Sequence, residues 1–170
     1  MKKELEKWIC TVLLIPIIIF LIINKGKFIF IDYINLLIHE GGHGIFKIFG
    51  KFLHAIGGTL TQILIPVMFV IYYLKNEKIF ISQILLVWLG ENFLNISVYA
   101  ADARTQKLPL LGGKKVYHDW NYILNELGIL NYDFIVGEIF YFIGIIIFII
   151  ALLLPLNRRG YKKEDIDLKL

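Results

Sequence analysis

Charged residues are scarce in this chain of 170 residues: Asp, Glu, Lys and Arg make up 19%, whereas hydrophobic residues make up 58% and aromatic residues 15%. A soluble domain of this size has too much surface to cover with so few polar side chains. The composition therefore excludes a disordered chain, a collagen-like repeat and an ordinary water-soluble domain. It indicates a chain whose main solvent is the lipid bilayer.

Cysteine is nearly absent as well, because Cys10 is the only one. A single cysteine forms no internal disulfide, so cysteine usage points to no oxidising compartment. A basic stripe or an RNA-binding motif is also missing: the net charge is +4, but Lys and Arg are scattered between apolar runs. Positive charge that flanks membrane segments explains this distribution, and we expect no nucleic-acid partner.

The apolar residues fall into five runs that we expect to be helices, because lipid offers no partner for unpaired backbone groups. The runs are too long and too uniform for the alternating strands of a barrel. No small-residue cleavage site follows the first run, so it is interpreted as a retained helix and not a signal peptide. The runs are residues 8–23, 28–53, 59–74, 79–101 and 134–156, with a further short helix over 122–130.

The sequence therefore predicts an all-α fold, a polytopic membrane helix bundle with about five membrane helices in residues 1–157, followed by a charged, exposed tail over 158–170. The Gly57-Gly58 pair is expected to end the second run. If all five runs cross, the 18 Lys and Arg residues divide nine and nine between the two sides. If the second run enters without fully crossing, both termini share a side that holds ten of them, which favours cytoplasmic termini. We expect a multi-pass protein of the cell membrane.

The second run contains His39-Glu40-Gly41-Gly42-His43, a match to H-E-x-x-H. Residues four apart share one face of a helix, so both imidazoles can bind one Zn²⁺ with Glu40 beside the open coordination position. Zinc lowers the pKa of its bound water toward ~7 and polarises a carbonyl. Glu40 would accept the proton of that water and pass it to the leaving amine.

Coincidence explains this motif poorly, since chance gives roughly 0.004 such matches in a chain with four His and eight Glu. Ionisable groups at membrane depth are also costly and usually functional. The alternative is a pair of helix-packing histidines with a glutamate that pairs with Lys47 or a neighbouring helix. Gly41, Gly42 and Gly44 each weaken the helix by ~1 kcal/mol, but they permit close approach of another helix or an extended substrate.

A third protein ligand is needed, and the residues alone leave it open. His54 lies eleven residues past His43, about 16 Å along a helix, so it reaches the same ion only if the helix breaks at Gly50. Otherwise it is a polar histidine at a helix end. Further polar groups in the apolar helices could orient a substrate, hold zinc ligands or join helices: Gln62, Asn92 and Asn95.

Carboxylates further along the chain are the other candidates. Glu91 and Asp102 are eleven positions apart, so at most one of them is expected to reach the metal. Asp102 could instead form an ion pair with Arg104. An aspartate next to a histidine, as in His118-Asp119, can be a ligand or can orient one, or the pair can lie in an interfacial loop.

The H-E-x-x-H motif inside an apolar helix resembles the site-2 protease family of intramembrane zinc metallopeptidases. The resemblance spans roughly residues 30–104, and its specific part is the five-residue motif. It implies that His39 and His43 bind zinc and that Glu40 is the general base.

In that family an aspartate of a later membrane helix completes the zinc site, a few residues after an asparagine in a Pro-rich motif. Asn95 followed by Asp102 corresponds to that pair, although no proline lies between them and Ala103 stands where the family has glycine. The resemblance thus implies Asp102 as the third metal ligand. The residues themselves leave His118 as the alternative.

The leading hypothesis is an intramembrane zinc metallopeptidase that cleaves a membrane-protein or peptide substrate, with Zn²⁺ as cofactor and residues 101–133 covering the site. A non-catalytic membrane protein, either a scaffold or one with a structural metal, is the alternative. A metal transporter is disfavoured, because the chain has one compact cluster and neither repeated halves nor a row of ionisable residues.

Overall fold

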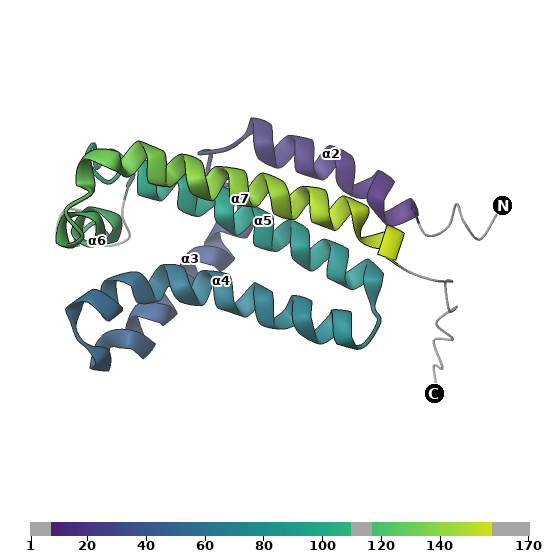
Figure 1. The fold of residues 1–170 in the computed structure, drawn as a ribbon, viewed down its shortest axis with the longest axis horizontal. Helices are drawn as coiled ribbons and strands as arrows, with labels where there is room; N and C mark the ends of the chain where they lie inside the picture. The colour runs from purple at the N-terminus through teal and green to yellow at the C-terminus, as the bar shows by residue number, and fades with distance from the viewer. Residues whose placement is uncertain (1–7, 110–116, 158–170) are drawn as a thin grey trace.

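The computed structural model describes residues 8–109 and 117–157, and these residues form α-helices and short 3-10 helices without a strand. Figure 1 shows an elongated bundle in which α2, α4, α5 and α7 run along the long axis. The α-helices are α2 (Ile9–Ile23), α3 (Phe30–Phe46), α4 (Lys51–Lys75), α5 (Ile79–Ala101), α6 (Asp119–Glu126) and α7 (Asp133–Leu153). The 3-10 helices are η1 (Lys47–Phe49), η3 (Leu130–Tyr132) and η4 (Leu154–Asn157). The prediction of an all-helical bundle is confirmed for the described residues.

Helix α5 lies at the centre and packs against α7, α4 and α2. Near its start, the buried Gln83 amide donates hydrogen bonds to Thr11 Oγ1 (2.8 Å) and to the carbonyl oxygen of Ala151 (2.9 Å). These bonds join the start of α2 to the end of α7. Both ends of the described chain therefore lie at the same end of the bundle, the arrangement expected if the second apolar run does not fully cross.

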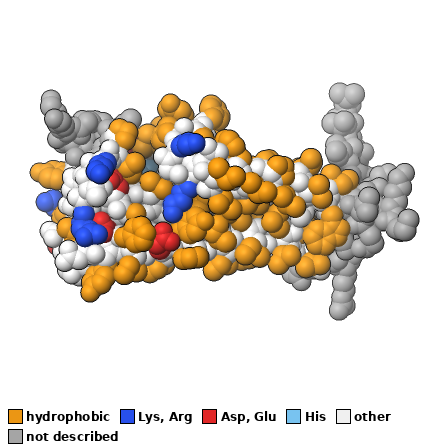
Figure 2. Space-filling view, turned by 90° about the horizontal axis from the view of Figure 1, so that it is seen from above, with side chains coloured by type: hydrophobic (Ala, Val, Ile, Leu, Met, Phe, Trp, Pro, Cys, Tyr) orange, Lys and Arg blue, Asp and Glu red, His pale blue; other side chains and the backbone are white. Residues whose placement is uncertain are grey.

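Three segments are long and apolar enough to span a membrane: Lys51–Lys75, Ile79–Ala101 and Leu130–Leu156. Helix α2 is apolar but has 15 residues, about 22 Å, which is short of a ~30 Å hydrocarbon core. Outward side chains of α7 such as Ile139 and Phe142 are more than half exposed. Charged side chains gather at the α6 end of the face in Figure 2, and apolar side chains cover the rest of it.

The prediction that Gly57-Gly58 ends the second run is wrong, because the chain turns at Gly50 instead. Gly50 has φ +94°, a left-handed conformation that favours glycine, and it separates η1 from α4. Helix α4 then continues through Gly57 and Gly58 to Lys75. The turn at Gly50 folds α4 back along α3, so the two helices form an antiparallel hairpin.

The glycines inside the α3–α4 hairpin allow its close packing. A Cβ atom at Gly42 would lie 2.4 Å from the carbonyl oxygen of Gly57, and one at Gly57 would lie 2.6 Å from Cβ of Phe46. Side chains at these positions would force the helices apart. A Cβ at Gly41 or Gly44 would meet nothing within 4 Å, so of the motif-region glycines only Gly42 serves helix contact.

The described residues between α5 and α7 are held by partly buried polar contacts. Asp133, at the start of α7, accepts hydrogen bonds from the backbone N–H (3.1 Å) and the Nε (2.7 Å) of Arg104. The short helix spans Asp119–Glu126 and not 122–130, because the His118 side chain accepts from the N–H of Asn121 and caps the helix there. The predicted tail over 158–170 lies outside the described residues.

Glycine contacts in the bundle give a test of this packing. A Cβ atom at Gly90 would lie 2.5 Å from the ring of buried Phe148, across the α5–α7 contact. We expect Gly90→Ala to destabilise the protein by about 1–3 kcal/mol, and Gly44→Ala, which meets open space, to be neutral or slightly stabilising. Thermal unfolding in detergent micelles measures both, and equal unfolding temperatures would contradict the packing.

Candidate metal centre

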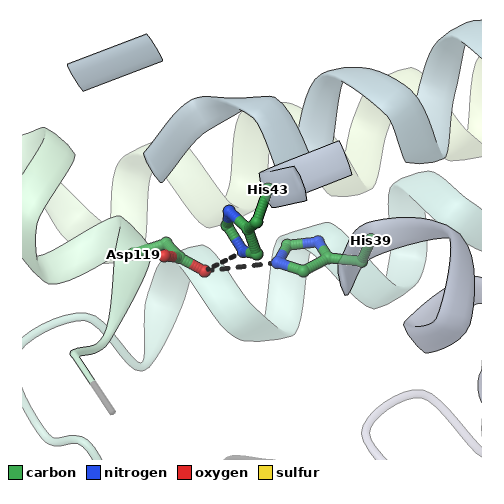
Figure 3. A group of neighbouring side chains, drawn as sticks. All are labelled: His39, His43 and Asp119. Carbon is green, nitrogen blue, oxygen red and sulfur yellow. Dashed lines mark hydrogen bonds and ion pairs between the residues drawn. The ribbon is translucent and has the colours of Figure 1, made fainter. Parts of the chain in front are cut away.

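Two histidine side chains from the H-E-x-x-H motif point at one carboxylate oxygen. His39 and His43 lie one turn apart on α3, and each Nε2 is 3.2 Å from Oδ2 of Asp119, the first residue of α6 (Figure 3). The three ligand atoms lie within 4.8 Å of one another. The α3 helix and the segment after α5 thus meet at a group that could hold a metal ion.

The other ring nitrogens of these histidines are held by oxygen acceptors. Nδ1 of His43 donates to the carbonyl oxygen of His54 (2.7 Å), and Nδ1 of His39 donates to Oε1 of Gln62 (3.2 Å). These oxygens can only accept, so each ring carries a hydrogen on Nδ1, and Nε2 is the nitrogen that remains for a metal ion. Two Nε2 atoms and a carboxylate oxygen therefore face one another, an arrangement that protons on the rings or a shared metal ion would stabilise.

The two His–Asp spacings and the partners of the rings are compatible with zinc. Ligand atoms about 2.0–2.2 Å from a tetrahedral zinc lie about 3.3–3.6 Å apart, close to the 3.2 Å of both His–Asp pairs. Zinc-binding histidines also usually donate their second ring N–H to an oxygen acceptor. Two imidazoles and one carboxylate leave a fourth position open, as in catalytic zinc sites.

Asp119 is fixed as an anion in this group. Burial raises the pKa of its carboxyl group, but the hydrogen bonds with His39 and His43 outweigh burial and hold that pKa well below its ordinary value. Its backbone N–H donates to the hydroxyl oxygen of Tyr99 (3.1 Å), and that hydroxyl donates to Oδ2 of Asp119 (3.0 Å). Tyr99 on α5 therefore orients both the backbone and the side chain of the candidate ligand.

Space for the His39 ring comes from a glycine of the facing helix. A Cβ atom at Gly58 would lie 2.5 Å from Nε2 of His39 and 2.7 Å from two ring carbons. The ring cannot move away freely, because its two nitrogens are held by Gln62 and Asp119. Gly58 therefore lies inside α4 and leaves the space that the His39 ring occupies.

Glu40 faces a cavity of about 920 Å³ that the metal group also lines. Its side chain is exposed, unlike buried His39. The cavity walls are mostly apolar, with Leu36, Leu94 and Val98 among them. The arrangement places an exposed carboxylate on the cavity that the metal group lines, which has room for a chain segment.

The structure does not bring Asp102 to the histidines of the motif. Burial raises the pKa of its carboxyl, but hydrogen bonds from Thr105 and from the backbone N–H groups of Leu108 and Lys107 outweigh it and lower the pKa. Its Oδ2 lies 3.5 Å from Nε2 of His118. Asp102 is thus committed to a turn, and Asp119 replaces it as the candidate third ligand.

His118, the alternative ligand, is also not part of the group of His39, His43 and Asp119. Its Nδ1 accepts from the N–H of Asn121 and its ring packs on Tyr99, with ring centroids 4.4 Å apart. Burial lowers its pKa. His118 therefore caps α6 and supports the residue next to it, the aspartate at which the motif histidines point.

The remaining polar candidates surround the group without joining it. The turn at Gly50 does bring His54 to His43, but its Nδ1 donates to the carbonyl oxygen of His43 (2.9 Å), so the two residues lock α3 to α4. Gln62 contacts His39, and Asn95 contacts Gln62. Glu91 and Asn92 are buried on α5, where Glu91 accepts from Asn35 and Asn92 donates to the carbonyl oxygen of Trp88.

Comparison with family models, with curated proteins and with solved structures found no match to this chain. The assignment of the site therefore stands on its own geometry.

The third ligand can be tested by zinc binding. We expect Asp119→Ala to weaken zinc binding by more than about 100-fold, because it removes the anionic donor of the group. Asp102→Ala should bind zinc as the wild type does, since Asp102 lies in a separate turn. Competition with a chelating dye measures the dissociation constants, and loss of zinc in Asp102→Ala but not in Asp119→Ala would contradict the assignment.

The space at Gly58 gives a second test, with a control from the motif. We expect Gly58→Ala to weaken zinc binding by at least tenfold, since the added methyl group collides with the His39 ring. Gly41→Ala adds the same methyl group beside Glu40 in open space and should leave the affinity unchanged. Equal affinities for the two folded variants would show that the close approach has no bearing on metal binding.

Proposed function

We propose that this protein is a zinc metallopeptidase of the cell membrane, a multi-pass protein that hydrolyses a peptide bond at or near the bilayer. The observation that supports this most is the convergence of His39 Nε2, His43 Nε2 and Asp119 Oδ2, with Glu40 beside them. The resemblance of the motif to the site-2 protease family agrees with the proposal.

The chain would hold Zn²⁺ through His39, His43 and Asp119. A bound zinc ion supplies Lewis acidity, which acidifies water and polarises a peptide carbonyl. The hydrogen bonds to Gln62 and to the carbonyl oxygen of His54 keep both ligand rings in the tautomer that offers Nε2. The protein residues thus arrange the donors before any metal arrives.

Glu40 would move the proton in this reaction. It is the motif residue next to His39, its carboxylate is exposed to the cavity, and no hydrogen bond to a described residue occupies it. It can accept a proton from the attacking water and then donate it to the leaving amine, the two halves of general acid–base catalysis. An exposed carboxylate suits this role better than the buried, bonded Asp119.

The position of the site indicates the kind of substrate. The metal group lies at the α6 end of the bundle, the end where charged side chains gather on the face in Figure 2. Its cavity has apolar walls, while Lys25, Lys27 and Lys51 also line it. A peptide segment near the membrane surface, with apolar residues to fill the cavity, is the substrate class that this lining favours.

Glu40→Gln separates catalysis from metal binding. We expect this variant to bind zinc as the wild type does and to lose about 10²–10⁴-fold in cleavage rate, because the proton acceptor is gone while the ligands stay. The purified, zinc-loaded proteins in detergent micelles are incubated with a peptide library made from a membrane proteome. New amino termini are then labelled and counted by mass spectrometry.

Cleavage by the wild type that is absent in Glu40→Gln supports the proposal. Identical sets of new termini with both proteins, or none with either while zinc is bound, would leave a non-catalytic metal site as the better account.

A further inference from the structure

A chain of hydrogen bonds leads from the candidate zinc ligand His39 to a buried carboxylate on the same helix. His39 Nδ1 donates to Gln62 Oε1 (3.2 Å), and Gln62 Nε2 donates to Asn95 Oδ1 (3.3 Å). Asn95 Nδ2 then donates to Asp32 Oδ1 (2.7 Å). The chain crosses from α3 to α4 to α5 and returns to α3, and its members line the cavity of the metal group.

Every bond in this chain points the same way, and Asp32 accounts for the direction. Asp32 Oδ2 accepts from the backbone N–H of Ile29 (2.6 Å) while Oδ1 accepts from Asn95, so the carboxylate acts only as an acceptor toward both. Asn95 must therefore turn its NH₂ toward Asp32 and its oxygen toward Gln62. Gln62 is oriented in turn, with its oxygen toward His39.

The last step reaches the metal ligand. Because Gln62 offers an oxygen, Nδ1 of His39 carries a hydrogen, so the nitrogen that the ring offers to a metal ion is Nε2, which faces Asp119. We infer that Asp32 is a positioning residue that sets the tautomer of His39 through Asn95 and Gln62. The inference rests on the proposed metal site and adds a residue that neither the motif nor the ligand set contains.

The burial of these groups strengthens the argument. Asp32 is 4% exposed and Gln62 is 3% exposed, so water cannot readily replace a partner or allow an amide to turn over freely. Glu91 is a second carboxyl group beside Asp32. It accepts its hydrogen bond from Asn35, outside the chain to His39, which makes it the control for removal of a nearby carboxyl group.

Replacing Asp32 by asparagine can reverse the whole chain. An asparagine NH₂ at this position would donate to Asn95 Oδ1, Asn95 would then donate to Gln62 Oε1, and Gln62 would donate to Nδ1 of His39. The ring hydrogen would move to Nε2, which then offers no lone pair to a metal. A change about two helical turns from the ligand would thus weaken the metal site without touching it.

The experiment measures zinc dissociation constants of the full-length protein in detergent micelles by competition with a chelating dye. We expect Asp32→Asn to weaken binding by about 10–100-fold, the range for residues that orient a metal ligand. Glu91→Gln makes the same acid-to-amide change beside the chain and should bind as the wild type does. Nitrogen-15 chemical shifts of the histidines in the metal-free protein report whether the His39 hydrogen has moved from Nδ1 to Nε2.

A rescue variant separates orientation from a general loss of structure. In Asp32→Asn/Gln62→Glu, the carboxylate of Glu at position 62 accepts directly from His39 Nδ1 and also from Asn95 NH₂. The reversed orientation of Asn95 then no longer affects the tautomer of His39. We expect the double variant to regain most of the lost zinc affinity and the wild-type tautomer. If Asp32→Asn fails to fold, Asn95→Ala interrupts the same chain and should weaken zinc binding similarly.

Unchanged zinc affinity in Asp32→Asn or Asn95→Ala, an equal loss in Glu91→Gln, or no rescue by the double variant would overturn the inference. His39→Ala is the control for each of these results. If His39→Ala also binds zinc normally, the metal site itself fails. If His39→Ala loses zinc, a negative result concerns Asp32 alone, and neither outcome depends on whether a peptide is cleaved.

Discussion

The close approach of α3 and α4 is the constraint on which the site depends. Three positions without side chains make it possible: Gly42 and Gly57 let the two backbones meet, and Gly58 leaves room for the ring of His39. Once the helices are this close, α4 supplies the acceptors for both ligand rings, from Gln62 and from the backbone of His54. The motif helix alone would present two imidazoles without fixed tautomers.

The hairpin is completed from the other side by the segment after α5. Tyr99 and the Asp102–His118 pair hold the start of α6 so that Asp119 faces the two histidines. The electrostatic cost of burying a carboxylate is offset by these contacts, because a charged group in apolar surroundings is stable only when it is paired and hydrogen-bonded. Asp102 and His118 thus form a supporting pair, whereas His39, His43 and Asp119 form the candidate ligand group.

The sequence predicts the helices well and the site in part. Long apolar runs leave helices as the only structure that lipid permits, so three of the five runs correspond closely to helices of the bundle, and the run 59–74 lies inside the longer α4. The end of the second run was predicted at the wrong glycine, because the sequence does not distinguish a glycine that makes a left-handed turn, Gly50, from one that allows close helix packing, Gly57. His39, Glu40 and His43 follow from spacing. Asp119 does not, because 76 residues separate it from His43 and only the tertiary structure brings them together; the adjacent His118-Asp119 pair was its one signal.

The buried polar residues of this chain are better explained by specificity than by stability. Replacing a buried polar network by apolar side chains is often neutral or stabilising, and so apolar a bundle could pack without Asp32, Asn95 and Gln62. An apolar replacement would lose the common direction of these hydrogen bonds. The Asp32 carboxylate accepts from Asn95, and this imposes a single orientation on each amide up to His39. A bundle that needed only to fill the bilayer would have no use for such an ordered chain, whereas the proposed metal site, which would present one ring nitrogen of His39 to a cation, would use it.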